Sequence, residues 1–281
     1  MATTLSFNTK VKLNDGNEMP IMGFGTYEMD GRDAYEAVTW ALEAGYRLID
    51  TAEWYENEKQ TGQAILNFCK ATDTPRSDIF YTTKLKNNNG YDASLASVKK
   101  SVEESGLGYV DLYLLHGPIG GTKARQDSWR AVVEAKKEGL VKSIGISTFG
   151  VKHLQEILDL GIGVPAVHQI DLHPFMTRTA IVKLCQEQGI TLEAWAPLVR
   201  GLRFDNPVVA QLAEKYKKWP AQILLRWSLQ KGYIPIPKSA SHKRIVSNTQ
   251  VFDFELTDED IEALDGLDEG LVTDWNPTEC D

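Results

Sequence analysis

The feature of this sequence that most constrains its fold is a glycine that recurs between a helix-like segment and a short apolar run. Glycine readily adopts the left-handed backbone conformation that ends many helices, so each such glycine predicts a helix end followed by a strand. The glycines are at positions 45, 106, 139, 161, 189 and 232, and the runs after them are YRLID, YVDLYLLH, VKSIGIS, AVHQIDLH, TLEAWAP and YIPIPKS.

Two further apolar runs, MPIMGFGT (19–26) and IFYTTKL (79–85), bring the number of predicted strands to eight. Strands that are almost uniformly apolar and alternate with helices are typical of a parallel sheet covered on its outer face. Eight such units fit a closed (β/α)8 TIM barrel better than an open doubly wound sheet, and no Gly-x-Gly-x-x-Gly follows the first strand. We therefore predict one (β/α)8 domain over residues 1–281.

Two segments stand outside this alternation. The stretch TKVKLNDGNEMP reads as a β-hairpin that turns at Asn14-Asp15-Gly16, and we expect it to plug the bottom of the barrel. Near the other end, Thr257 precedes three acidic residues, which is typical of the start of a short, capped helix, and an irregular tail follows it.

Composition excludes several classes of function. A net charge of -9 argues against binding nucleic acid or an anionic membrane through the overall field. The start lacks a targeting pattern, and no apolar run reaches the roughly 18 residues of a membrane span, so we expect a cytoplasmic protein. Three scattered cysteines match no metal spacing and predict reduced thiols, with Cys69 and Cys185 as core residues. We expect a monomer.

Ionisable and polar residues stand at the ends of the predicted strands, where (β/α)8 barrels have their active sites. Singly, each could be a cap, a solvated rim residue or part of the core. Their coincidence on one rim favours a functional site. They are Asp50, Lys84, His116, Gln169, Lys238 and Ser239, with Tyr55 in a polar segment after Asp50 that is too short for a helix.

This set of residues suits the reduction of a carbonyl group. A phenol has a pKa of about 10, so Tyr55 needs a nearby ammonium, such as Lys84, to stabilise its anion. An ammonium in a partly desolvated pocket keeps its proton if a carboxylate such as Asp50 pairs with it. His116 can hydrogen-bond the carbonyl oxygen and orient the substrate. None of these groups is a source of hydride, so a cofactor is required.

The chain resembles the aldo-keto reductases over nearly its whole length. The motifs that carry the resemblance are MGFGTY, GYRLIDTAEWYENE, TTKL, VDLYLLHGP, SIGIST, HQIDLHP, EAWAPL and IPKSASHKRIVSN. The resemblance implies a (β/α)8 barrel without a Rossmann domain, and an NADPH-dependent reductase of aldehydes or ketones. It also implies that Asp50, Tyr55, Lys84 and His116 are the catalytic residues, with Tyr55 as general acid.

The resemblance also implies a set of cofactor residues. The PKSASHKR stretch suits a phosphate monoester independently, because its cationic and hydroxyl side chains surround a predicted helix N-terminus, so we expect NADP(H) rather than NAD(H). The implied residues are Gly25, Thr26 and Leu198 near the cofactor, Ser147, Thr148 and Gln169 at the nicotinamide carboxamide, Trp195 stacked on the ring, and Lys238, Ser239, Arg244 and Asn248 at the 2′-phosphate and adenine.

The sequence departs from the family pattern at several positions. Thr148, Ala196 and Ser247 replace a frequent asparagine, serine and glutamate, which predicts weaker cofactor binding. Gly117 follows His116 where many members have a tryptophan. With short loops and a short tail, this predicts an open substrate site. The substrate-binding residues expected there are Tyr27, Trp54, His116 and Gly117, with Trp275 a further candidate wall and Arg200 either near the pyrophosphate or in solvent.

Two other interpretations are compatible with the residues. A cofactor-binding protein could act as a redox sensor with little turnover, although intact catalytic residues argue against it. A different barrel enzyme, such as a lyase or hydrolase, would be expected to show a metal cluster or another phosphate site, and the sequence shows no metal cluster. A small carbonyl compound therefore remains the expected substrate.

Overall fold

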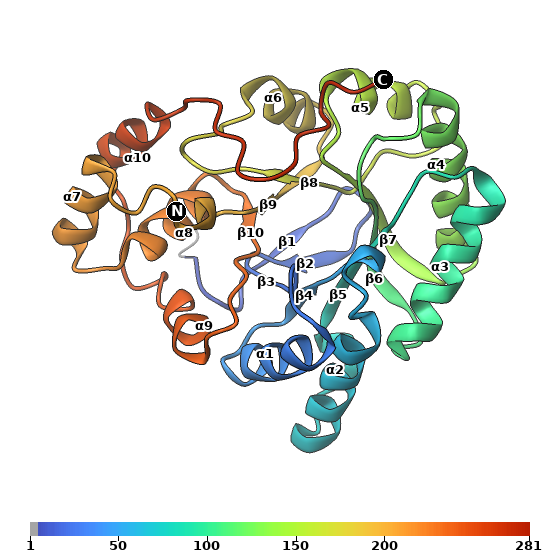
Figure 1. Ribbon diagram of the computed structural model, residues 1–281, viewed down its shortest axis with the longest axis horizontal. Coiled ribbons are helices and arrows are strands. Elements are labelled where there is room, and N and C mark those ends of the chain that lie inside the picture. Colours follow the sequence, from blue (N-terminus) through green and yellow to red (C-terminus); the bar gives the residue numbers. More distant parts are fainter. Residues whose placement is uncertain (1–4) are drawn as a thin grey trace.

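The computed structural model describes residues 5–281, which are built around a sheet of eight parallel strands curled into a barrel (Figure 1). Neighbouring strands pair in chain order, and a parallel bridge between Gly25 and Lys238 joins the first strand to the end of the last. The predicted (β/α)8 architecture is thus confirmed. The strands are β3 (Phe24–Gly25), β4 (Leu48–Asp50), β5 (Phe80–Leu85), β6 (Val110–Leu115), β7 (Val141–Ser147), β8 (Val167–Asp171), β9 (Thr191–Trp195) and β10 (Ile234–Pro235).

Helices cover the outside of the barrel and bury one apolar face against it. Val38, Leu42 and Trp129 are examples of side chains with almost no exposed surface on that face. The helices are α1 (Gly31–Glu43), α2 (Glu58–Thr72), α3 (Tyr91–Ser105), α4 (Thr122–Lys137), α5 (Val151–Leu158), α6 (Thr179–Glu187), α7 (Pro207–Tyr216), α8 (Pro220–Gln230), α9 (His242–Asn248) and α10 (Asp258–Asp265).

The glycine pattern identified the helix ends correctly. All six glycines have positive φ, between 63° and 100°. The end of helix α2 does not follow the pattern, because Asp73, with φ of 54°, adopts the left-handed conformation that a glycine adopts at those six helix ends. Between β9 and β10 the structure also has two helices, α7 and α8, and only the second precedes such a glycine.

The predicted hairpin is confirmed and closes the N-terminal end of the barrel. Strands β1 (Lys10–Lys12) and β2 (Glu18–Pro20) pair in antiparallel orientation. Leu13 and Met19 are almost fully buried and pack with barrel residues such as Leu112. Asn14 Nδ2 also donates a hydrogen bond of 2.9 Å to the Pro165 carbonyl, which fixes the turn on the barrel wall.

The predicted C-terminal helix is α10, and its cap is a reciprocal pair of hydrogen bonds. Thr257 accepts from the Asp260 amide at 3.3 Å, and the Asp260 carboxylate accepts from the Thr257 amide at 3.1 Å. Residues 266–281, the closing segment hereafter, then cross from α10 to the side of α4 and α5 (Figure 1). Within residues 5–281, no helix has the length and apolar character needed to span a bilayer.

The three cysteines are free thiols. Cys185 is fully buried, as expected, while Cys69 is half-buried and packs against the edge of the core. Among residues 5–281, no group of histidine, cysteine, aspartate and glutamate side chains is arranged to hold a metal ion.

Candidate active site

Three consecutive strands bring the four expected catalytic residues together at the C-terminal edge of the barrel. Lys84 Nζ lies 2.7 Å from Asp50 Oδ1, 2.8 Å from the Thr51 carbonyl oxygen and 3.4 Å from the Tyr55 hydroxyl. These three contacts use all three hydrogens of the ammonium. Lys84 and Asp50 are both buried, so their ion pair is shielded from water.

The loop that carries Tyr55 is more ordered than its sequence indicates. Residues Glu53–Tyr55 form one 3-10 turn, which ends where Glu56 adopts a left-handed conformation with φ of 54°. Buried Asn57 holds this turn, because its Nδ2 donates to the carbonyls of Thr26 and Met29 at 3.1 Å each and its Oδ1 accepts from the Thr51 hydroxyl. The sequence offered no specific signal for this role of Asn57.

The surroundings of Tyr55 keep its phenol protonated at neutral pH. Burial raises the pKa of Tyr55 to about 12, and the charge of Lys84 acts in the opposite direction. The net direction differs from the expected effect of Lys84 alone, because desolvation of the phenolate outweighs the ammonium. A protonated phenol next to an ammonium can donate its proton and leave a stabilised anion.

His116 lies beside Tyr55 and is held neutral. The two rings are 5.6 Å apart, edge to face. Burial lowers the pKa of His116 well below its ordinary value, and the charge of Lys84 lowers it further. Its Nδ1 is buried and has no hydrogen-bond partner among residues 5–281. Because Nδ1 is buried, Nε2 is the nitrogen that a ligand in the cavity can reach, and as an N–H it can donate to a carbonyl oxygen.

Gln169 connects the ion pair of Asp50 and Lys84 to a further acidic residue, Glu193. Gln169 Nε2 lies 2.8 Å from Asp50 Oδ2 and 2.8 Å from Glu193 Oε2. Glu193 is fully buried in the middle of β9. The signal was present in the sequence, because an acidic residue interrupts the otherwise apolar run TLEAW.

A single cavity of about 1020 Å³ opens over these residues and gathers most of the expected site. Three expected residues lie off its wall. Thr26 is buried and donates to the Asp50 carbonyl, Lys84 lies behind Asp50 and Tyr55, and Gly117 lines a neighbouring cavity of about 120 Å³. The expected residues on the wall are Gly25, Tyr27, Asp50, Trp54, Tyr55, His116, Ser147, Thr148, Gln169, Trp195, Leu198, Lys238, Ser239, Arg244 and Asn248.

One part of the cavity rim is cationic. Lys238, Lys243 and Arg244 are exposed, line the cavity and form no ion pair with any residue between 5 and 281. Ser239 Oγ accepts from Arg244 Nε at 3.2 Å and from the Ser241 amide at 3.1 Å, which orders the chain at the start of α9. Unpaired cations on a protein with a net charge of -9 make this rim suited to a phosphate group.

The arrangement matches a known family in sequence as well as in geometry. The family model described as "Aldo/keto reductase family" matches residues 21–269. The chain belongs to the aldo/keto reductase family. A glyoxal reductase of Bacillus subtilis is 42% identical over 276 residues, with 98% of each chain covered. An uncharacterized oxidoreductase of Schizosaccharomyces pombe is 45% identical over 268 residues, which are 95% of this chain and 96% of the relative.

Solved members of the family have the same fold. An aldo-keto reductase of Bombyx mori, solved in complex with NADP, superposes with a TM-score of 0.89 at 35% identity, covering 96% of this chain and 95% of that one. An aldo/keto reductase of Brucella melitensis superposes with a TM-score of 0.88 at 41% identity, covering 92% of this chain and 99% of that one. The eight-stranded barrel is thus shared with the family along nearly the whole chain.

Two positions that depart from the family pattern have left-handed backbones. Thr148 has φ of 55° and Ala196 has φ of 48°, a conformation that asparagine tolerates better than threonine does. The Thr148 amide still donates to the Gln169 carbonyl at 2.8 Å, and its hydroxyl lies 3.2 Å from that of Ser147. A small hydroxyl pair therefore stands where the family resemblance led us to expect an amide.

An aromatic wall faces Tyr55 and includes Trp275 of the closing segment. Trp54 lies 5.6 Å from the His116 ring and 6.1 Å from the Trp275 ring, while Tyr27 lies 5.2 Å from Tyr55. A Cβ added to Gly117 would come within 2.2 Å of the Trp275 ring. In this family member, the absence of a side chain at 117 thus creates the space that the indole of Trp275 fills.

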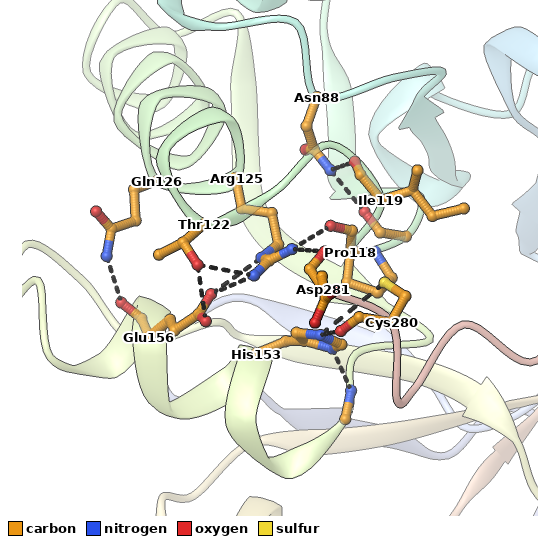
Figure 2. Close-up of polar contacts among 12 residues, drawn as sticks. Asn88, Pro118, Ile119, Thr122, Arg125, Gln126, His153, Glu156, Cys280 and Asp281 are labelled. Carbon is orange, nitrogen blue, oxygen red and sulfur yellow. Dashed lines mark hydrogen bonds and ion pairs between the residues drawn. The ribbon is translucent and has the colours of Figure 1, made fainter.

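The closing segment is anchored on two buried side chains of the outer helices (Figure 2). Arg125 of α4 donates to the Asp281 main-chain oxygen at 3.0 Å and the Pro118 carbonyl at 2.7 Å, and it pairs with Glu156 at 2.7 Å. His153 of α5 accepts from the Gly150 amide through Nδ1, so its Nε2 donates to the Cys280 carbonyl at 2.7 Å. These contacts hold the end of the segment that carries Trp275.

Arg200 links three parts of the rim, in addition to lining the cavity. Its guanidinium pairs with Glu28, after β3, at 3.0 Å and with Asp274 of the closing segment at 3.1 Å. The side chain is 37% exposed, so each pair is worth little by itself. Arg200 was expected either near the pyrophosphate or in solvent, and its ion pairs with two distant segments were not predicted.

Proposed function

We propose that this protein is an NADPH-dependent oxidoreductase that reduces aldehydes or ketones to alcohols. The observation that carries the proposal is the hydrogen-bonded cluster of Lys84, Asp50 and Tyr55, which opens on a large cavity with a cationic part of its rim. Membership of the aldo/keto reductase family supports it, as does the Bombyx mori relative solved with NADP.

In this proposal, Tyr55 is the general acid that protonates the carbonyl oxygen. Its phenol carries a proton at neutral pH, and Lys84 stabilises the phenolate that remains after transfer. Asp50 keeps Lys84 charged, because burial lowers the pKa of Lys84 while the carboxylate at 2.7 Å raises it, with a net upward direction. Neutral His116 binds the same carbonyl oxygen and orients the substrate against Tyr55.

The residues around the cavity suit NADPH. We propose that Lys238, Ser239, Arg244 and Asn248 hold the 2′-phosphate and adenine, since unpaired cations favour a phosphate monoester. At the barrel centre, Gly25, Ser147, Thr148, Gln169, Trp195 and Leu198 would surround the nicotinamide, with the Trp195 indole offering a stacking face. When bound, NADPH supplies the hydrogen and electron pair that reduce the carbonyl carbon.

The substrate side of the cavity suits compact or aromatic carbonyl compounds. Tyr27, Trp54 and Trp275 provide apolar faces on the cavity wall near Tyr55 and His116. The name of the Bacillus subtilis relative, glyoxal reductase, makes small dicarbonyl compounds a second class to test.

The test is the consumption of NADPH, and separately of NADH, by the purified protein with an activated aromatic aldehyde, an α-keto ester and glyoxal. We expect turnover with NADPH, and Tyr55→Phe should bind NADPH as the wild type does but turn over roughly 10²–10⁴-fold more slowly. Equal rates for the two proteins would refute the assignment of Tyr55. Tight NADPH binding without turnover of any carbonyl would favour a sensor instead.

A further inference from the structure

The interior of the barrel holds one more carboxyl group than the proposed chemistry uses. Glu193 is fully buried on β9, directly in register with Gln169 on β8 and with Ile234 on β10. An ionised carboxylate in such a place is costly unless a cation or several hydrogen-bond donors compensate it. The contacts of Glu193 therefore determine its protonation state.

Those contacts are few. Glu193 Oε2 accepts one hydrogen bond, of 2.8 Å, from Gln169 Nε2. Glu193 Oε1 is buried and has no hydrogen-bond partner among residues 5–281. Lys84 is the cation nearest in the network, but Asp50, the Thr51 carbonyl and Tyr55 already use its three hydrogens. Glu193 thus has neither an ion pair nor a full set of donors.

The charges of the cluster favour one proton shared between the two carboxyl groups. Lys84 contributes one positive charge, whereas ionised Asp50 and Glu193 together would contribute two negative charges linked by the same Gln169 amide. Asp50 touches the ammonium and Glu193 does not, so the proton belongs on Glu193. In agreement, burial and then the charge of Asp50 raise the pKa of Glu193 to about 8.

We propose that Glu193 is a positioning residue that is neutral in the working enzyme and, through Gln169 and Asp50, sets how readily Tyr55 gives up its proton. The inference rests on the proposed reductase function. With Glu193 neutral, Lys84 is balanced by Asp50 alone, and a phenolate at Tyr55 adds one negative charge. When Glu193 releases its proton to solvent, the extra negative charge opposes the phenolate and weakens the acid.

The groups that face Glu193 restrict the effect to this cluster. Asp50 on β4 and Lys84 on β5 are the titratable groups whose charges act on it, with Tyr55 beyond Lys84. Neighbouring β8 presents Gln169, and β10 presents Ile234, neither of which titrates. A pH effect on turnover that depends on residue 193 is therefore attributable to the charge of that residue.

The decisive variant is Glu193→Gln, which keeps the shape of the side chain and is neutral at every pH. We expect its kcat at pH 6.5 to lie within about twofold of the wild type. Between pH 7 and 9 the wild-type kcat for reduction should fall by about tenfold, following a group with an apparent pKa near 8, while the variant should lose most of this decline. Exposed Glu187→Gln should follow the wild-type profile.

A second readout is independent of turnover. In the difference between the infrared spectra of unliganded wild type and Glu193→Gln, the carbonyl band of a protonated carboxyl group should be present at pH 6.5 and disappear as the pH rises above 8. The subtraction removes the contribution of Asp171, whose pKa burial raises to about 6. Superimposable pH profiles, or no such difference band at pH 6.5, would overturn the proposal. A wild type that shows the band but reduces no carbonyl would refute the proposed function and leave the protonation of Glu193 supported.

Discussion

Two clusters of buried charged residues, one inside the barrel and one beneath the closing segment, differ in how fully their polar atoms are bonded. Arg125 has five hydrogen bonds, to Glu156 twice and to Thr122, Pro118 and Asp281. A guanidinium has five N–H donors, so its capacity is used completely. Inside the barrel, Lys84 is also satisfied, but Glu193 Oε1 and His116 Nδ1 are not.

The difference indicates what each cluster does. A fully bonded buried cluster fixes one arrangement of the chain, as expected of an anchor. A polar atom left without a partner costs free energy in the folded protein, and one that lies within a proposed active site can accept a ligand or a proton there. We therefore expect the cluster around Arg125 to be structural and the cluster around Lys84 to take part in the proposed chemistry. Variants in each cluster can test the distinction.

The largest effect is expected from Lys84→Met, which removes the one cation of the inner cluster. Asp50 would remain buried without its partner, and the cost to the free energy of unfolding should be about 3–5 kcal/mol. Turnover should fall by roughly 10²-fold or more, because the Tyr55 phenolate loses its ammonium. Denaturant unfolding and NADPH oxidation measure the two effects. Unchanged stability would contradict the assignment of a buried ion pair.

A smaller and different effect is expected from Arg125→Met in the outer cluster. The variant removes five hydrogen bonds, but Glu156 is 15% exposed and can regain water, so the expected loss in stability is about 2–4 kcal/mol. Loosening of the closing segment should raise KM several-fold, because Trp275 is displaced, and should change kcat less.

The matched control for this variant is Arg130→Met. Arg130 lies on the same helix, is 45% exposed and pairs with Asp127 at 3.6 Å, so little change is expected. Unfolding curves and limited proteolysis of residues 266–281 would compare the two variants. A loss of kcat in Arg125→Met equal to that in Lys84→Met would erase the distinction between the clusters.

The smallest effect is expected from the titration of His153. Burial lowers the pKa of His153 below its ordinary value of 6.5, so the unfolded chain binds a proton more readily than the folded protein does. The stabilisation from neutral His153 is therefore complete above pH 6.5 and is lost as the pH falls toward the folded pKa. His153→Gln should make stability between pH 6.5 and 5 less dependent on pH.

His168 and His173 act in the same direction, because burial lowers their pKa to about 3 and about 4. The measurement must therefore compare how steeply the free energy of unfolding changes with pH in His153→Gln and in the wild type, because the wild-type value alone includes all three histidines. Identical slopes would show that His153 does not titrate differently in the folded protein.

Local chemistry explains how much of the fold the sequence predicts. A glycine that must be left-handed, or an apolar run that ends on Asp50, is visible in a few consecutive residues, and eight parallel strands then place their ends on one rim. The helix end at Asp73 was not predicted, because an aspartate there adopts the left-handed conformation that glycine usually adopts. The sequence also placed most of the expected residues on one cavity wall.

Contacts between distant segments explain what the sequence did not predict. Arg125 meets Asp281 across 156 positions and His153 meets Cys280 across 127, so nothing near either residue identifies it as an anchor. Glu193 is visible as an acid in an apolar strand, but its protonation depends on Asp50 and Lys84 from two other strands. Whether Thr26 faced the cavity or lay behind it depended equally on its tertiary partners.

The contact between Gly117 and Trp275 has a consequence for how this protein can evolve. The two positions share one volume, because any side chain at 117 would overlap the indole that the closing segment delivers. A lineage that introduces a larger residue at 117 must shrink or relocate the residue at 275 in the same step or accept a strained intermediate. The two sites, 158 positions apart in the sequence (275 − 117), should therefore change together among descendants of this chain.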